Sequence, residues 1–149
     1  MALLIGRYEY SLDGKNRVAI PPKFREALQG ERGRSFYITS GLEGCLYLFL
    51  PSQWERLLSD DLVLFALPDK EEERAFKRKF FSEAVELEPD AMGRVLIPSY
   101  LKDYAGLRGG VLVQGVGKRG EIWDKGRWAS YRRLKVEPVY RKASRRLEI

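Results

Sequence analysis

The sequence predicts an α+β fold in which one β–β–α–β–β unit, followed by a helix, occurs twice in a single chain. Three observations predict it. Residues 8–21 and 85–98 follow the same pattern when the chain is shifted by 77 residues. Both copies alternate apolar and polar residues, as half-buried strands do. A proline then opens a short segment with helical apolar spacing after each copy. The fold should therefore be pseudo-symmetric, with two small halves sharing one core.

The first copy begins with a strand, a tight turn and a returning strand. Residues 8–12 alternate apolar and polar side chains. Asp13-Gly14 is a strong turn signal, because glycine accepts the positive φ of hairpin turns. Residues 17–20 then return as the second strand. We expect these two strands to form a hairpin.

A short helix and two further strands complete the first copy. Phe24 and Leu28 lie four residues apart, which places both on one face of a helix that Gly30 can end. Apolar runs at 36–38 and 46–50 predict the strands. The second copy repeats this order with strands at 85–87 and 94–97, expected to pair with each other, a helix between Pro98 and Gly106, and strands at 111–113 and 121–123.

Helices are expected between and after the copies. Pro68 should end a first connecting helix, and the capping-box spacing of Asp69 and Glu72 predicts the start of a second. The predicted organisation is a first repeat at 7–54, a helical connector at 55–82, a second repeat at 83–126 and a basic C-terminal helix or tail at 127–149.

The charge distribution favours an anionic partner. The net charge is +6, and residues 126–149 account for all of it, with eight basic residues against two acidic ones. Such a tail raises the expectation of nucleic-acid binding, although it could equally serve solubility. No apolar run approaches the length of about 18 residues that a membrane-spanning helix needs, so no membrane partner is expected.

The residue types disfavour catalysis and metal binding. The chain has no histidine, which removes the commonest general base and metal ligand. The single cysteine, Cys45, lies in an apolar run and is interpreted as a small buried hydrophobe in a protein of the reducing cytoplasm. No phosphate-binding glycine loop with a following Gly-Lys-Ser/Thr is present. We expect neither enzyme activity nor a cofactor.

The repeated Asp-x-x-x-Arg pattern is the strongest functional signal. Asp13 can accept backbone N–H groups within its turn, and Arg17 could pair with it in a purely structural ion pair. Alternatively, the aspartate fixes the turn while the arginine presents a planar fork to a phosphate or to guanine in DNA. The predicted DNA contacts are Arg17, Lys15, Arg94, Lys23, Arg25 and Arg7, with Asp13, Gly14, Asp90 and Gly93 forming the turns.

The two copies are not equally basic. Ala91 and Met92 occupy the positions of Gly14 and Lys15 in the second copy. Fewer cations therefore surround Arg94 than Arg17. We expect the first copy to make the main DNA contact and the second to contribute mostly structure.

The residues from Gly6 to Pro21, from Asp90 to Pro98 and from Ala105 to Leu107 resemble the MraZ family of bacterial transcriptional regulators. The resemblance covers about residues 1–130. It implies that each repeat is a swapped-hairpin unit of the AbrB type, and that the two form a double-psi-type β-barrel core with flanking helices. It also implies a ring-like homo-oligomer, associated with the nucleoid, that binds short direct repeats in double-stranded DNA upstream of its own division and cell-wall operon.

Two other classes of function remain open from the sequence. One is a nucleic-acid-binding architectural protein, for DNA or RNA, that uses the basic tail without sequence preference. The other is an antitoxin-like module that binds a protein partner through the short C-terminal segment.

Overall fold

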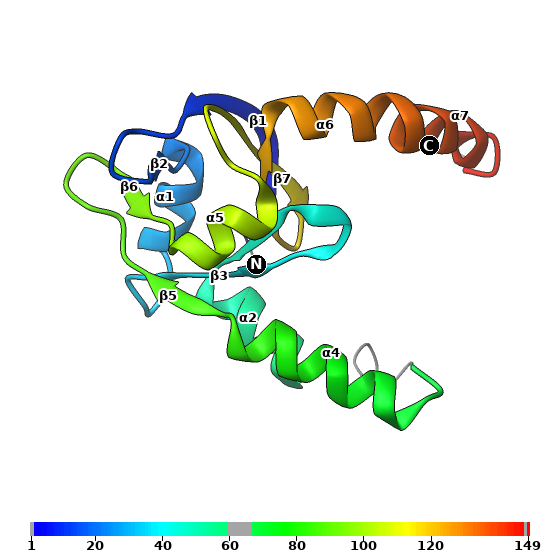
Figure 1. The fold of residues 1–149 in the computed structure, drawn as a ribbon, viewed down its shortest axis with the longest axis horizontal. Coiled ribbons are helices and arrows are strands. Elements are labelled where there is room, and N and C mark those ends of the chain that lie inside the picture. The colour runs from blue at the N-terminus through cyan, green and yellow to red at the C-terminus, as the bar shows by residue number, and fades with distance from the viewer. Residues whose placement is uncertain (1, 60–66, 148) are drawn as a thin grey trace.

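The structure, a computed structural model, describes residues 2–59, 67–147 and 149. Its strands form a six-stranded antiparallel sheet and a separate two-stranded sheet (Figure 1). The larger sheet has the order β1 (Leu4–Ser11), β7 (Gly110–Gly117), β8 (Gly120–Asp124), β4 (Leu46–Phe49), β3 (Phe36–Ser40) and β5 (Val85–Leu87). The smaller sheet pairs β2 (Arg17–Ala19) with β6 (Arg94–Leu96).

The helices lie between and after these strands. They are α1 (Pro22–Gln29), α2 (Pro51–Ser59), α4 (Lys70–Ser82), α5 (Ser99–Ala105), α6 (Lys125–Tyr131) and α7 (Glu137–Ser144), with a 3-10 turn at Leu42–Gly44 and a π-helical turn at Arg132–Val136. The expected α+β architecture with a repeated unit is confirmed. None of the helices in the described ranges is both long and apolar enough to cross a membrane.

Strand pairing crosses between the two copies, so the expected hairpins are wrong. β1 pairs with β7, β2 pairs with β6, and β5 pairs with β3. Only one hydrogen bond, from Asp13 N to Arg17 O at 3.0 Å, closes the first turn before its two strands separate. Separation lets Val18 and Val95 face each other, and both are fully buried. Each returning strand therefore helps to cover a core that both halves share.

The strand pairings do not make a closed barrel. Within the described residues, β1 and β5 are the two edges of an open sheet, and β2 and β6 pair only with each other. β2 and β6 are three residues long, which limits the ladder that they can add. The expected closed double-psi barrel is thus not found in the pairing pattern.

Hydrogen bonds between the copies follow the 77-residue shift. Ile20 N donates to Gly93 O at 2.9 Å, and Ile97 N donates to Asn16 O at 2.9 Å. Adding 77 to the first pair of positions yields the second pair with the two copies exchanged. The two turns are therefore held in equivalent positions on either side of β2 and β6.

The proline-led helices form as predicted. In α1, Phe24 and Leu28 are buried and Gly30 is the C-terminal cap. In α5, Leu101 and Ala105 are buried, and Gly106 ends the helix in the left-handed region at φ 63°. That conformation costs glycine little, because it has no Cβ.

Two apolar clusters lie on opposite faces of the larger sheet. The first packs β2, β6, α1 and α5 against the sheet, and its buried members include Val18, Ile20, Phe24, Val95, Ile97 and Leu101. The second is aromatic and packs α2, α4 and α6 on the other face, and its members include Tyr47, Phe49, Trp54, Phe80, Leu112 and Trp123. The turns before β2 and β6 thus belong to the first face.

The connector is helical where it is described. α4 begins after Asp69, whose side chain accepts a 2.8 Å hydrogen bond from Glu71 N. The expected ion pair between Glu73 and Lys77 forms at 3.0 Å. The predicted break of the first helix at Pro68 involves residues 60–66, which lie outside the described residues.

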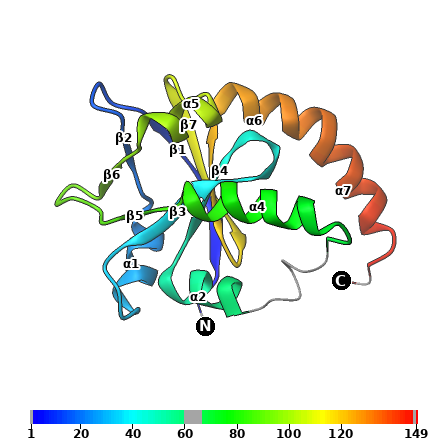
Figure 2. The same cartoon turned by 60° about the horizontal axis from the view of Figure 1, so that its bottom comes forward.

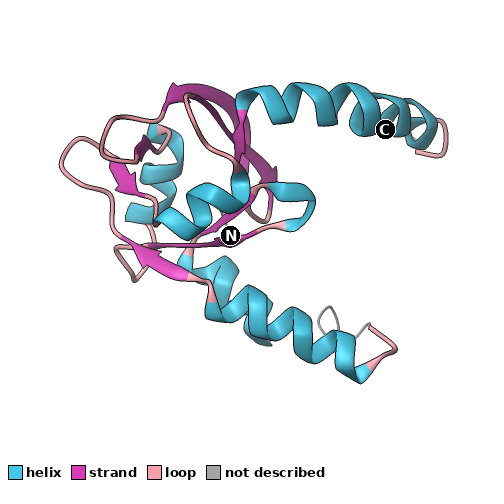
Figure 3. Cartoon of the chain, in the orientation of Figure 1, coloured by secondary structure: helices cyan, strands magenta, loops and turns pink. Residues whose placement is uncertain are grey.

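The turns and the long helices point in different directions. Figures 1 and 3 show the turns before β2 and β6 at one end of the molecule. α4 and the continuous run from α6 to α7 project from the other end as two helical arms, and Figure 2 shows the curve of the second arm. The predicted DNA-contacting turns therefore lie away from both arms.

Candidate nucleic-acid interface

The first Asp-x-x-x-Arg turn is organised by its aspartate. Asp13 Oδ1 accepts hydrogen bonds from Lys15 N and Arg17 N, both at 2.9 Å. Asp13 Oδ2 accepts a third from Arg17 Nε at 2.7 Å. The carboxylate thus fixes the loop and the arginine side chain together, as an Asx-type turn allows.

The second turn has the same geometry. Asp90 Oδ1 accepts from Met92 N and Arg94 N at 2.9 Å, and Asp90 Oδ2 accepts from Arg94 Nε at 3.2 Å. The structural interpretation of the motif, an ion pair within the turn, is therefore confirmed in both copies. It does not exclude a second role for the arginines, because each pair uses Nε rather than the whole guanidinium group.

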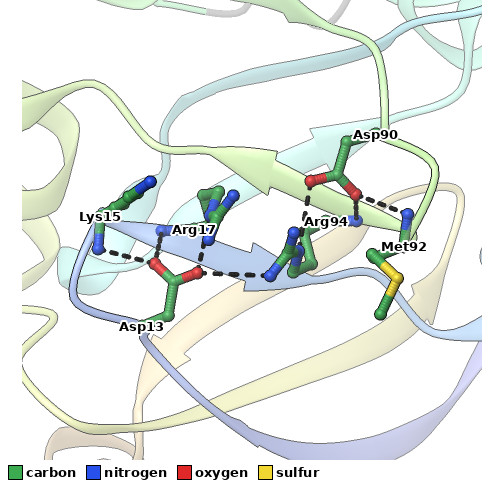
Figure 4. Close-up of polar contacts among 6 residues, drawn as sticks. All are labelled: Asp13, Lys15, Arg17, Asp90, Met92 and Arg94. Carbon is green, nitrogen blue, oxygen red and sulfur yellow. Dashed lines mark hydrogen bonds and ion pairs between the residues drawn. The ribbon is translucent and has the colours of Figure 1, made fainter.

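The two turns also meet each other across the smaller sheet (Figure 4). Arg94 Nη1 lies 3.7 Å from Asp13 Oδ2. The register places Arg17 opposite Leu96 and Ala19 opposite Arg94, while Val18 and Val95 point into the core. Strand alternation therefore puts both arginines on the outward face. About 30% of each arginine side chain is exposed.

Both aspartates are charged at neutral pH. Hydrogen bonds from the backbone of Arg17, from its side chain and from the backbone of Lys15 lower the pKa of Asp13 to about 2. The equivalent bonds, led by the backbone N–H of Arg94, lower the pKa of Asp90. Accepting several hydrogen bonds favours the ionised carboxylate. Each turn therefore holds a permanent negative charge that orients a guanidinium group.

The sharp bend in each turn lies two residues later than we predicted. Asn16 has φ 61° and Gly93, at the equivalent position, has φ 78°. Gly14 is not in the left-handed region. Asparagine tolerates this conformation better than most residues because its short side chain bonds locally. The Asp-Gly sequence therefore predicted the turn but not the residue that carries its positive φ.

Arg25 joins the first copy to the second turn. Its Nε donates to Ile20 O at 3.1 Å, and its guanidinium group lies against Gly93. A Cβ built at Gly93 would lie 2.6 Å from Arg25 Cζ. Arg25 is half-buried and thus positions the turn, in addition to any contact with an outside phosphate.

The predicted lysines are exposed near the turns. Lys15 lies in the first turn, and Lys23 lies in the first turn of α1 with a 3.6 Å ion pair to Glu26. Neither lysine is held in place by burial. Both can therefore reach a phosphate on the side where the turns project.

Arg7 does not join this group. It is exposed on β1, where Tyr8 and Tyr10 point into the first apolar cluster. Alternation therefore turns Arg7 to the opposite face of the sheet, where it lines a groove with Lys125 and Arg133. The other predicted cations, Arg17, Arg94, Lys15, Lys23 and Arg25, are gathered around the two turns and α1.

Two exposed apolar side chains of the interface were missed by the sequence analysis. Met92 is 72% exposed and Leu96 is 56% exposed. They flank Arg94 at two-residue spacing, so strand alternation, applied to residues 92–96, would have placed them on the outward face. The second copy thus presents an apolar surface where the first presents Lys15 and Ala19.

Sequence comparisons identify relatives over nearly the whole chain. A family model described as "MraZ protein, putative antitoxin-like" matches twice, at residues 3–79 and 80–148. The chain is similar to proteins named "Transcriptional regulator MraZ" from Clostridium beijerinckii (43% identical, 91% of each chain), Acetivibrio thermocellus (44%, 87% and 86%) and Heliobacterium modesticaldum (38%, 97% and 96%). This family is one of transcriptional regulators and is not enzymatic, which agrees with the expectation from the sequence. With two family matches and relatives of about 40% identity along most of its length, the chain belongs to the MraZ family.

Proposed function

We propose that the protein is a transcriptional regulator that binds double-stranded DNA at tandem repeats upstream of its own division and cell-wall operon. Relatives over nearly the full length are named transcriptional regulators, which supports a DNA partner. The observation that carries the proposal is the pair of outward arginines, Arg17 and Arg94, on one small sheet.

The guanidinium of Arg17 is oriented but not consumed by its ion pair. Asp13 binds Nε, and no described residue accepts a hydrogen bond from Nη1 or Nη2. The aspartate therefore restrains the side chain and leaves two donor groups for a ligand. A planar pair of donors matches the O6 and N7 atoms of guanine, or two phosphate oxygens. Restraining the arginine in advance lowers the entropy lost on binding.

The remaining contacts divide by chemistry. Lys15 and Lys23 are exposed cations that supply phosphate contacts, which position the protein without reading sequence. Met92 and Leu96 are exposed apolar groups that suit the methyl group of thymine. The first copy therefore makes the main charged contact, and the second contributes Arg94 with an apolar surface.

We also propose the finer structural features of the family. Pairing of β1 with β7 and of β2 with β6 supports two swapped-hairpin units of the AbrB type within one chain. A ring-like homo-oligomer, associated with the nucleoid, would repeat the turns at a fixed spacing. Tandem DNA sites could then be bound through several weak contacts at once.

Titration of labelled DNA tests this function. Upstream DNA of the operon and a scrambled duplex are titrated at several salt concentrations with the wild type, Arg17→Ala, Arg17→Lys and Arg78→Ala. Arg78 is an exposed arginine on α4 and is the matched control. Arg17→Ala and Arg17→Lys should both weaken upstream binding by about 10- to 100-fold, because lysine lacks the fork. Arg78→Ala should not change it.

Lys15→Ala should behave differently from Arg17→Ala. It should weaken both duplexes alike and reduce the log–log salt slope by about 0.9. Retention of upstream binding by Arg17→Ala would overturn the proposed role of the turns. Equal binding of both duplexes by the wild type would instead indicate an architectural protein without sequence preference.

A further inference from the structure

We infer that a second site, distinct from the DNA-binding turns, lies between β1 and the C-terminal helices and takes a compact ligand carrying at least two phosphate groups. The site is a groove of about 680 Å³. Its volume falls within the range of about 300–1,000 Å³ that is typical of small-molecule sites. Nothing in the proposed DNA contact uses this groove.

The charges of the groove are strongly unbalanced. Five cationic side chains and two carboxylates line it. Both carboxylates are already in ion pairs, Glu9 with Lys125 at 3.1 Å and Glu137 with Arg132 at 2.8 Å. The other three cations are arginines for which the described residues provide no carboxylate or hydrogen-bond partner: Arg7, Arg133 and Arg141.

These arginines reach the groove from separate elements. Arg7 comes from the outer face of β1, Arg133 from the π-helical turn and Arg141 from α7. Like charges gathered on facing elements repel one another, so a bound anion would relieve an unfavourable arrangement. Three guanidinium groups match a diphosphate better than a single carboxylate, since each can donate a pair of hydrogen bonds to phosphate oxygens.

The floor of the groove is apolar. Leu112 is almost completely buried, and Trp128 lines the groove while its ring stacks at 5.2 Å from that of Trp123. An aromatic wall beside phosphate-binding groups suits a nucleobase. The shared chemistry is therefore a diphosphate, either free as pyrophosphate or attached to a nucleoside.

A duplex is the competing source of phosphates. The cations of the groove face one another across a hollow, whereas the backbone of a duplex is best met by an outward surface such as the turns. We therefore assign the groove to a small ligand, and make occupation by duplex DNA one of the outcomes that would contradict it.

Isothermal titration of the full chain tests the assignment. Pyrophosphate, ADP, adenosine and a short duplex are titrated separately into the wild type at low salt. Pyrophosphate or ADP, but not adenosine, should give saturable binding at one site per chain. ADP binding more tightly than pyrophosphate would identify a nucleotide as the source, and equal affinities would identify free diphosphate.

Three variants locate the site. The double variant Arg133→Ala/Arg141→Ala and the single variant Arg7→Ala should each weaken binding at least about tenfold, because each removes a charge-assisted contact. The matched control, Arg145→Ala/Arg146→Ala, removes the same charge from exposed positions on the same tail that do not line the groove. It should change affinity by less than about twofold. Circular dichroism and thermal unfolding confirm that each variant folds.

Three results would overturn the inference. They are the absence of saturable binding by both phosphate ligands, an equal loss of affinity in the control variant, and loss of duplex binding in the groove variants when neither small ligand binds. Because these titrations contain no operator DNA, their failure would leave the proposed role of Arg17 untouched. Conversely, loss of operator recognition by Arg17→Ala would say nothing about the groove.

Discussion

Replacing Gly93 by alanine tests whether the contact between the two copies holds the second turn in place. Gly93 has φ 78°, and an added Cβ would lie 2.6 Å from Arg25 Cζ and 2.7 Å from Arg25 Nε. Alanine in the left-handed region costs about 1–2 kcal/mol. Displacing Arg25 also breaks its hydrogen bond to Ile20 O, a further loss of about 0.5–1.5 kcal/mol. We expect Gly93→Ala to lower the free energy of unfolding by about 2–3 kcal/mol.

A double-mutant cycle separates these two causes. In an Arg25→Ala background the steric conflict is absent, so Gly93→Ala should cost only the backbone term of about 1–2 kcal/mol. The two substitutions should therefore be less than additive by about 1 kcal/mol. Gly14→Ala is the control, because nothing lies within 4 Å of its added Cβ and its φ is not left-handed. It should change stability by no more than about 0.5 kcal/mol.

Urea unfolding at one fixed protein concentration measures all four variants and the wild type. The fixed concentration matters because self-association would make apparent stability depend on it. Additivity of Arg25→Ala and Gly93→Ala within about 0.3 kcal/mol would refute the contact as a source of coupling. A cost of Gly14→Ala equal to that of Gly93→Ala would refute the placement of the left-handed residue.

Three further predictions concern acid stability, the cysteine and the C-terminal arm. The folded pKa of Asp13 is about 2, below its usual 3.8, so its stabilisation is present above the higher value and is lost as pH falls through the lower one. Urea unfolding at stepped pH should therefore show a smaller loss between about pH 4 and pH 2 for Asp13→Asn than for the wild type. Burial raises the pKa of Cys45, so a thiol reagent should label it only as the protein unfolds, and rapid labelling of the native protein would contradict this. Arg127 donates to two loop carbonyls at 2.8 and 3.1 Å, so Arg127→Ala should lower the unfolding free energy by about 1–3 kcal/mol, whereas a neutral effect in urea would contradict a structural role.

The sequence predicted the elements of the fold better than their partners. Alternation at 8–12 and 94–97 located strands and their buried faces, because side-chain direction follows from the backbone within a few residues. It could not distinguish pairing of β2 with β1 from pairing with β6. Both arrangements bury Val18, and the choice depends on contacts between residues 77 positions apart.

The same distinction between local and distant contacts applies to the interface. The bonds of Asp13 to the backbone of Lys15 and Arg17 span at most four residues, so the motif alone predicted them. The contact of Arg25 with Gly93 joins the two copies, and no local pattern indicates it. Arg7 is near the turn in sequence but points to the other face of the sheet, because strand parity rather than sequence distance decides the face.

Comparison of the two turns separates what the motif does for structure from what it does for recognition. The bonds of Asp90 to its own turn reproduce those of Asp13, so Asp-x-x-x-Arg builds the same loop in either sequence context. Those bonds leave the outward positions unconstrained, and there the copies differ: Lys15 stands where the second copy has Met92. A pseudo-symmetric frame with unlike outward side chains is polar, with a cationic end and an apolar end. It can therefore bind a direct repeat in one orientation, whereas two identical turns would fit a palindrome equally well in both.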